Sequence, residues 1–85
     1  MQAWKLVLDE AAFQFFVASR SAQRRRLLSA LDDLRSNPQR EADYLTKDST
    51  DRTLNVVAVR PFLITYWLDA FGLEVRIVDI EEIHV

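Results

Sequence analysis

The stretch Arg52-Thr-Leu-Asn-Val-Val-Ala-Val-Arg-Pro-Phe-Leu-Ile-Thr-Tyr-Trp-Leu-Asp-Ala-Phe-Gly-Leu-Glu-Val-Arg-Ile-Val-Asp-Ile80 decides the fold of this chain. It contains three runs that are rich in β-branched and aromatic residues, the types that suit a pleated and half-buried surface. These runs predict strands over residues 52–59, 62–68 and 73–80.

Two short breaks determine how the three strands connect. Pro61 has a fixed φ and no N–H for a strand ladder, so Arg60 and Pro61 are expected to form a turn. The second break, residues 69–72, contains Gly72, the only glycine in the chain, which can adopt a positive φ. A parallel pair would need a crossover of about a dozen residues or more, so connections this short predict an antiparallel meander.

The chain before these strands begins with a strand pattern and then a helix pattern. Residues 3–8 alternate like an edge strand, and Asp9 after them is typical of a helix cap. A short helix is predicted over residues 10–20. Its expected core-facing residues are Ala12, Phe13, Phe16 and Val17, with Phe15 widening the stripe.

A second, more regular helix is predicted over residues 22–36, with its apolar side chains at Leu27, Leu28, Leu31 and Leu34. Asn37-Pro38 ends it, because the residue before proline is pushed out of the α region. Residues 39–51 are expected to be a polar connection. The predicted fold class is therefore α+β in the order β-α-α-β-β-β, with a two-helix hairpin packed on a small antiparallel meander sheet.

Length and composition predict one small domain, residues 1–85, with its own core. Nearly half of the 85 residues, 49%, are apolar and nine are aromatic, which argues against intrinsic disorder. The absence of cysteine excludes disulfides and thiolate metal sites, and no signal peptide or membrane span is recognisable, so we expect a cytoplasmic protein. The net charge of −2 lacks the general basic field of most nucleic-acid binders, so any RNA contact requires a local patch.

Several motifs, taken in order, resemble the RelE/ParE superfamily of toxins from type II toxin–antitoxin pairs. They are Ser36-Asn37-Pro38 followed by Arg40-Glu41-Ala42, the strand Phe62-Leu-Ile-Thr-Tyr66, and the final strand Val75-Arg-Ile-Val-Asp-Ile80, after an N-terminal strand and helix pair. The match covers nearly the whole chain. It implies the RelE/ParE-like fold and a cognate antitoxin that wraps the toxin with a helix or an extended segment.

The resemblance leaves the cellular target open. A RelE-like toxin cleaves messenger RNA on the ribosome and so inhibits translation, whereas ParE-like members bind DNA gyrase and are not nucleases. Both kinds belong to modules that include plasmid stabilisation systems. Since fold alone does not choose between them, the side chains must decide.

Three positions depart from the pattern of RelE-like nucleases. Aligned on Tyr66, the arginine of the family's strand motif falls on Leu63, and two usual basic positions of the preceding strand fall on Val56 and Ala58. None of these side chains can bind a phosphate. By the alternation of strands they are expected to share a sheet face, or to lie close, and to make an apolar surface where a nuclease needs cations.

The remaining catalytic candidates are His84, Arg60 and Glu41. The resemblance implies His84, because a subset of the family ends in a His-Tyr pair with a catalytic histidine, and here the pair is His84-Val85. Imidazole is a suitable acid or base near neutral pH, while the alternative is a chain-end histidine without a role. The same subset places a helper carboxylate at Glu41, and Arg60 at the hairpin tip can reach a phosphate; both can equally be solvated surface groups.

Other side chains have two interpretations each. Arg52 and Arg76 are alternative phosphate contacts. The side chains of Arg24-Arg25-Arg26 fan around a helix, so they do not form one patch for RNA and can equally pair with Asp32. The aromatic residues Trp4, Tyr66 and Trp67 can stack bases but occur at strand spacing typical of a core. No phosphate-binding loop or metal-ligand motif is recognisable, and no cofactor or metal is expected.

Two functional classes therefore remain open. The first is a ribosome-dependent endoribonuclease that works through His84 with arginines at new positions. The second is a protein-binding module, either ParE-like or restricted to its antitoxin. The missing strand arginines and the acidic balance favour the second class, whereas the terminal His84 favours the first. Because both faces of strand 62–68 are largely apolar, we expect a partner to cover one, or a homodimer when the antitoxin is absent.

Overall fold

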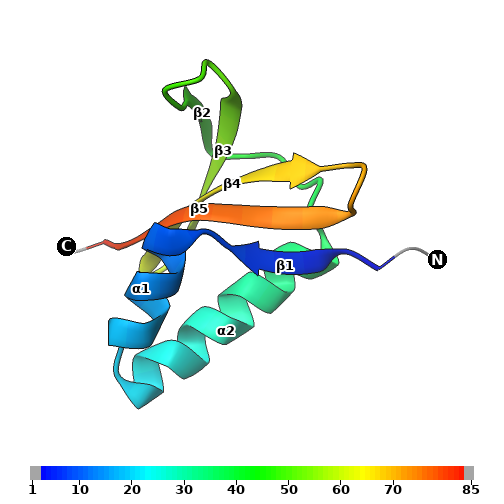
Figure 1. Ribbon diagram of the computed structural model, residues 1–85. Coiled ribbons are helices and arrows are strands. Elements are labelled where there is room, and N and C mark those ends of the chain that lie inside the picture. The colour runs from blue at the N-terminus through cyan, green and yellow to red at the C-terminus, as the bar shows by residue number, and fades with distance from the viewer. Residues whose placement is uncertain (1–2, 84–85) are drawn as a thin grey trace.

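The computed structural model describes residues 3–83, which form two helices and one five-stranded sheet (Figure 1). In chain order the elements are β1 Lys5–Leu8, α1 Glu10–Ala18, α2 Ser21–Ser36, β2 Tyr44–Lys47, β3 Thr53–Val59, β4 Phe62–Asp69 and β5 Glu74–Glu82. The predicted α+β fold class is confirmed. No helix of this described part is long and apolar enough to cross a membrane.

The strands lie in the order β1-β5-β4-β3-β2, and β3, β4 and β5 form the predicted antiparallel meander. The β1 strand lies at the edge, as expected, but runs parallel to β5. Its ends are held by hydrogen bonds from the Lys5 N–H to the Leu73 oxygen at 2.8 Å and from the Asp9 N–H to the Ile77 oxygen at 2.9 Å. A parallel pair is possible here because two helices and the other strands separate β1 from β5 along the chain.

Both helices cover one face of the sheet, and no helix covers the other face within residues 3–83 (Figure 1). The core between them contains the α2 side chains Leu27, Leu31 and Leu34. Its strand side consists of Val57, Phe62, Ile64, Tyr66, Val75, Ile77 and Ile80. Trp4, Leu6 and Leu8 pack against this cluster, which confirms the alternation predicted for the first strand.

The helices are phased differently from the prediction at three positions. Phe13 and Val17 of α1 are 54% and 55% exposed, and Leu28 of α2 is 50% exposed. Only the narrower stripe through Ala12, Phe15 and Phe16 faces the sheet from α1. An apolar residue at helical spacing is therefore not enough to predict burial, because the width of the buried stripe depends on how closely the neighbouring elements approach.

The segment 39–51, expected to be a polar connection, contains the strand β2. It pairs antiparallel with β3, with Tyr44 opposite Val56 and Lys47 opposite Thr53. All four residues of β2 are exposed, so backbone hydrogen bonds to β3 stabilise this strand, and burial of its side chains does not.

Two local predictions about loop and cap residues also need correction. The positive φ near the β4–β5 turn belongs to Leu73, at 53°, and not to Gly72. Asp9 is the N-cap of α1 by position, but its side chain makes no capping hydrogen bond. The Asp9 carboxylate instead lies 3.3 Å from a guanidinium nitrogen of Arg76.

Candidate functional site

The outer face of the sheet, the side away from the helices, carries the three positions that depart from the nuclease pattern. Leu63 lies opposite Ala58 of β3, and Thr65 lies opposite Val56. Residues directly opposite each other in an antiparallel pair project to the same face. Val56, Ala58 and Leu63 therefore share this face, as the alternation rule predicts.

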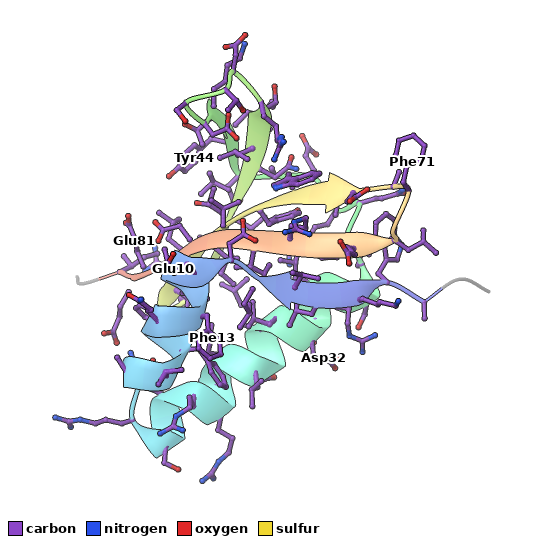
Figure 2. All side chains as sticks on the ribbon, in the orientation of Figure 1. Glu10, Phe13, Asp32, Tyr44, Phe71 and Glu81 are labelled. Atoms are coloured by element: carbon purple, nitrogen blue, oxygen red, sulfur yellow. The ribbon has the colours of Figure 1, made fainter. Side chains whose placement is uncertain are left out.

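The neighbouring strand adds carboxylates to this face. Glu81 of β5 lies opposite Leu63, and Asp79 lies opposite Thr65. Figure 2 shows Glu81 on the side of β5 that faces away from the helices. A phosphate at this position would therefore meet apolar side chains and two carboxylates, and not the cations that stabilise a phosphorane.

The outer face also contains a stack of one aromatic ring and two guanidinium groups. The Arg52 guanidinium carbon lies 4.0 Å from the centroid of the Trp67 ring, and that of Arg76 lies at 5.6 Å. Arg76 also contacts the carboxylates of Glu74, at 3.0 Å, and Asp9. Trp67 therefore lies on the outer face, whereas Tyr66 is buried in the core and Trp4 packs against the core. The guanidinium group of Arg76 is already paired with two carboxylates.

The sequence-predicted site residues are distributed as follows. His84 lies outside the described residues. Arg60 is exposed in the turn between β3 and β4, and Glu41 is exposed in the loop before β2. The carboxylate of Asp43 accepts the Ala58 N–H at 2.6 Å, so the loop that carries Glu41 runs beside the half of β3 that leads to Arg60.

Tyr66, on which the family motif was aligned, has its hydroxyl in the core and not at a reactive surface. The side chain is fully buried, and no described residue accepts or donates a hydrogen bond at its oxygen. Burial raises the Tyr66 pKa, which Arg40 lowers and Asp43 raises to smaller extents. Tyr66 therefore supports the fold and is not available for proton transfer to a substrate.

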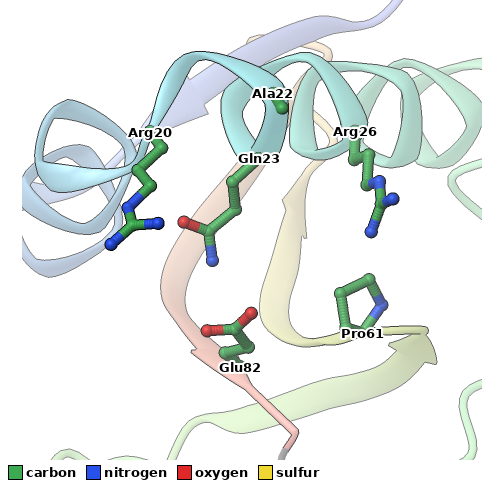
Figure 3. A pocket seen from close by; sticks show the side chains of 6 residues that line it. All are labelled: Arg20, Ala22, Gln23, Arg26, Pro61 and Glu82. Carbon is green, nitrogen blue, oxygen red and sulfur yellow. The ribbon is translucent and has the colours of Figure 1, made fainter.

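A feature that the sequence did not predict lies between α2 and the β3–β4 turn, and we call it the α2 groove. It consists of two adjoining pockets of about 470 Å³ and 340 Å³ that share Arg26 and Pro61. The first is also lined by Arg20, Ala22, Gln23 and Glu82, and the second by Ser29, Ala30, Asp33, Val59 and Arg60. Figure 3 shows Arg26 directed toward Pro61, with Gln23 and Glu82 facing each other across the first pocket.

The arginine run of α2 is divided between separate environments, as its helical fan predicts. The Arg24 Nε donates to the Ser19 carbonyl oxygen at 3.1 Å, and Arg26 lines the α2 groove. Arg25 does not pair with Asp32, because Asp32 binds Arg35. The spacing of Arg20, Gln23 and Arg26 at intervals of three indicates that these side chains lie on one side of the helix. It could not predict the groove, because the β3–β4 turn and the end of β5 that close it are far away in sequence.

Residues 3–83 contain no cluster of three metal-ligating side chains. No protein-family model matches the sequence, and no curated protein matches it.

Solved structures do match it over almost its full length. The isolated E. coli RelE toxin is 19% identical, with a TM-score of 0.75, over 98% of this chain and 87% of that one. A chain of the intact E. coli RelBE toxin–antitoxin complex is 20% identical, with a TM-score of 0.73, over 98% of this chain and 100% of that one. A chain of the archaeal RelE–RelB complex from Pyrococcus horikoshii OT3 is 17% identical, with a TM-score of 0.69, over 95% and 96%.

These identities are too low to carry over an activity, but the agreement in fold is nearly complete along the chain. The strand, the two helices and the final three-stranded meander agree with the order that the sequence motifs implied, and β2 and the parallel β1–β5 pair are additions to it. The chain therefore has a RelE-like fold.

Proposed function

We propose that this chain is the toxin-family protein of a toxin–antitoxin module, and that it acts in the cytoplasm by binding proteins and not by cutting RNA. Its first partner is a cognate antitoxin. Two of the similar structures are complexes of a toxin with an antitoxin, which supports this partner. The cellular target in this proposal is another protein, of which DNA gyrase is the ParE-like example.

The chemistry of the outer face carries the proposal. Cleavage by 2′-hydroxyl attack needs cations around the phosphorane, and mutational loss of a single oxyanion-stabilising donor typically costs about 10²–10³ in rate. Val56 is only 2% exposed, and Leu63 and Ala58 offer no donor side chain. Asp79 and Glu81 lie beside these positions and repel a phosphate there, so this part of the face suits an apolar or basic protein segment.

The second candidate is a ribosome-dependent endoribonuclease with its site displaced to the β3–β4 turn. In that mechanism His84 transfers the proton, Arg60 binds the phosphate and Glu41 orients or assists the histidine. One contact favours it: the Ile83 N–H donates to the Pro61 carbonyl oxygen at 2.6 Å. The residue next to His84 in sequence therefore lies beside the turn that carries Arg60.

Four assays on one set of variants distinguish these candidates. We expect the chain to bind the product of the neighbouring small gene and to leave message intact on programmed ribosomes. We also expect His84→Ala to leave antitoxin binding and the effect on cell growth unchanged. Gyrase supercoiling and cell growth under induced expression test for a protein target. Message cleavage that His84→Ala abolishes and Arg60→Ala weakens would support the nuclease, and failure to bind the neighbouring product would contradict the antitoxin assignment.

A further inference from the structure

The α2 groove lies where this acidic chain concentrates its positive charge. The chain has a net charge of −2, yet residues 20–26 contain four arginines and no acidic residue. Two of them, Arg20 and Arg26, line the groove together with Arg60 from the β3–β4 turn. Within residues 3–83 none of these three arginines forms an ion pair, so their guanidinium groups are available to a ligand.

The groove is not uniformly basic. Glu82 lines the first pocket and Asp33 the second, one on each side of the shared residue Arg26. The rest of the lining provides amide and hydroxyl groups from Gln23 and Ser29, and apolar surface from Ala30, Val59 and Pro61. The groove therefore presents alternating charges and short apolar patches, a combination that matches a peptide better than a polyphosphate.

A single-stranded RNA carries one negative charge at each nucleotide. A strand lying along the groove would therefore bring phosphates against Glu82 and Asp33 as well as against the arginines. A peptide can instead match each charge separately, and an arginine fork binds a carboxylate with two parallel hydrogen bonds. Arg20 and Asp33 are separated by 13 helical positions, about 20 Å at 1.5 Å per residue, which is the length of roughly six extended residues.

We propose that the α2 groove binds an extended segment of about six residues from the antitoxin, in which an acidic side chain contacts Arg26 and Arg60 and basic side chains contact Glu82 and Asp33. This inference rests on the proposed function, since it names the part of the chain that recognises the partner. Recognition by alternating charges gives specificity for one antitoxin, because a wrong partner would place like charges together.

The test is a set of charge reversals with a matched control on the same helix. Arg26→Glu and Glu82→Lys change the groove, whereas Arg25→Glu makes the same change as Arg26→Glu at a neighbouring residue that does not line it. We expect Arg26→Glu and Glu82→Lys each to raise the Kd for the neighbouring gene's product about 10-fold or more, and Arg25→Glu to change it less than about 3-fold. Circular dichroism and thermal unfolding verify that the variants fold.

A compensating exchange on the antitoxin strengthens the test. Replacing the matching acidic residue of the antitoxin by arginine should restore binding to the Arg26→Glu variant and weaken binding to the wild type. If the wild type binds the antitoxin and none of the groove variants changes the Kd, this inference is wrong while the proposed function stands. If the wild type does not bind it, both are wrong.

The same variants distinguish an RNA ligand from a peptide ligand by whether Glu82→Lys tightens or weakens binding. A short single-stranded RNA oligonucleotide serves as the probe, with binding followed by fluorescence anisotropy. A phosphate site predicts that Glu82→Lys tightens RNA binding and that Arg26→Glu abolishes it. That result, together with unchanged antitoxin binding, would overturn the peptide assignment.

Discussion

At the scale of single residues, Tyr66 has the least compatible environment in the described chain. Its ring fills the core, but its hydroxyl has no hydrogen-bond partner among residues 3–83. A buried hydroxyl without a hydrogen bond costs about 1–3 kcal/mol relative to a satisfied one. Tyr66 therefore stabilises the fold through its ring and destabilises it through its oxygen.

Tyr66→Phe should leave the free energy of unfolding unchanged at pH 7 or raise it by up to about 1–3 kcal/mol. Because burial raises the Tyr66 pKa above the ordinary tyrosine value of 10.0, the folded state favours the neutral phenol. The stability that the neutral Tyr66 phenol contributes is fully present below the pKa that Tyr66 has in the unfolded chain. It is lost as the pH rises through the higher pKa that Tyr66 has in the folded protein. Raising the pH above 10 should therefore lower the free energy of unfolding of the wild type more than that of Tyr66→Phe, as measured by urea denaturation.

A variant at the exposed Tyr44, Tyr44→Phe, provides the control for this pH series. It should follow the wild type at every pH. A loss of more than about 1 kcal/mol on Tyr66→Phe at pH 7 would mean that the hydroxyl is hydrogen-bonded in solution, contrary to its environment here.

At the scale of elements, the two helices and the β2–β3 hairpin differ in what holds them. Each helix is fixed by a narrow buried stripe, whereas the hairpin turn is held by hydrogen bonds, most of them to or from Asp48. The Asp48 carboxylate accepts hydrogen bonds from the Thr50 hydroxyl at 2.7 Å, the Thr50 N–H at 2.9 Å and the Arg52 N–H at 3.0 Å. These bonds, the Thr50 hydroxyl first, lower the Asp48 pKa below 3.8.

The helix phase of α2 can be measured with two leucines. Leu31 is fully buried, so Leu31→Ala should lower the free energy of unfolding by about 2–5 kcal/mol. Leu28 is half exposed, so Leu28→Ala should cost less than about 1 kcal/mol. Urea denaturation of both variants tests this order, and an equal loss would show that α2 is rotated relative to the sheet.

At the scale of the whole molecule, apolar surface remains on the helix layer. Phe13 and Val17 of α1 and Leu28 of α2 are about half exposed, and Figure 2 shows Phe13 on this layer. Large exposed apolar side chains are uncommon in a stable monomer when they gather on one side. This surface is separate from the α2 groove, whose lining contains none of the three residues.

We expect the purified chain to self-associate at micromolar concentration when its antitoxin is absent. Replacing Phe13 and Leu28 together by serine should shift it toward the monomer in sedimentation experiments, because it removes exposed apolar area. The thermal midpoint should change little, since both side chains are already half exposed. A wild type that sediments as a monomer at this concentration would contradict the expectation.

Local sequence patterns were enough to predict the three strands of the meander, both helices and the departure of the outer face from a cationic site. These features depend on local rules: β-branched runs, the turn at Pro61, helical spacing and the alternation that places Val56, Ala58 and Leu63 together. Each of them can be evaluated from residues that are close in the chain.

Packing between distant parts of the chain determines the parallel pairing of β1 with β5, the existence of β2, the exposure of Phe13 and Leu28, and the α2 groove. Periodicity tells which side of an element is apolar, but not which element will cover it or how widely. The groove joins a helix, a turn and the end of a distant strand, so Arg26 and Glu82 come together only when the core orients α2 on the sheet. Long-range packing, which no local pattern encodes, decided these features.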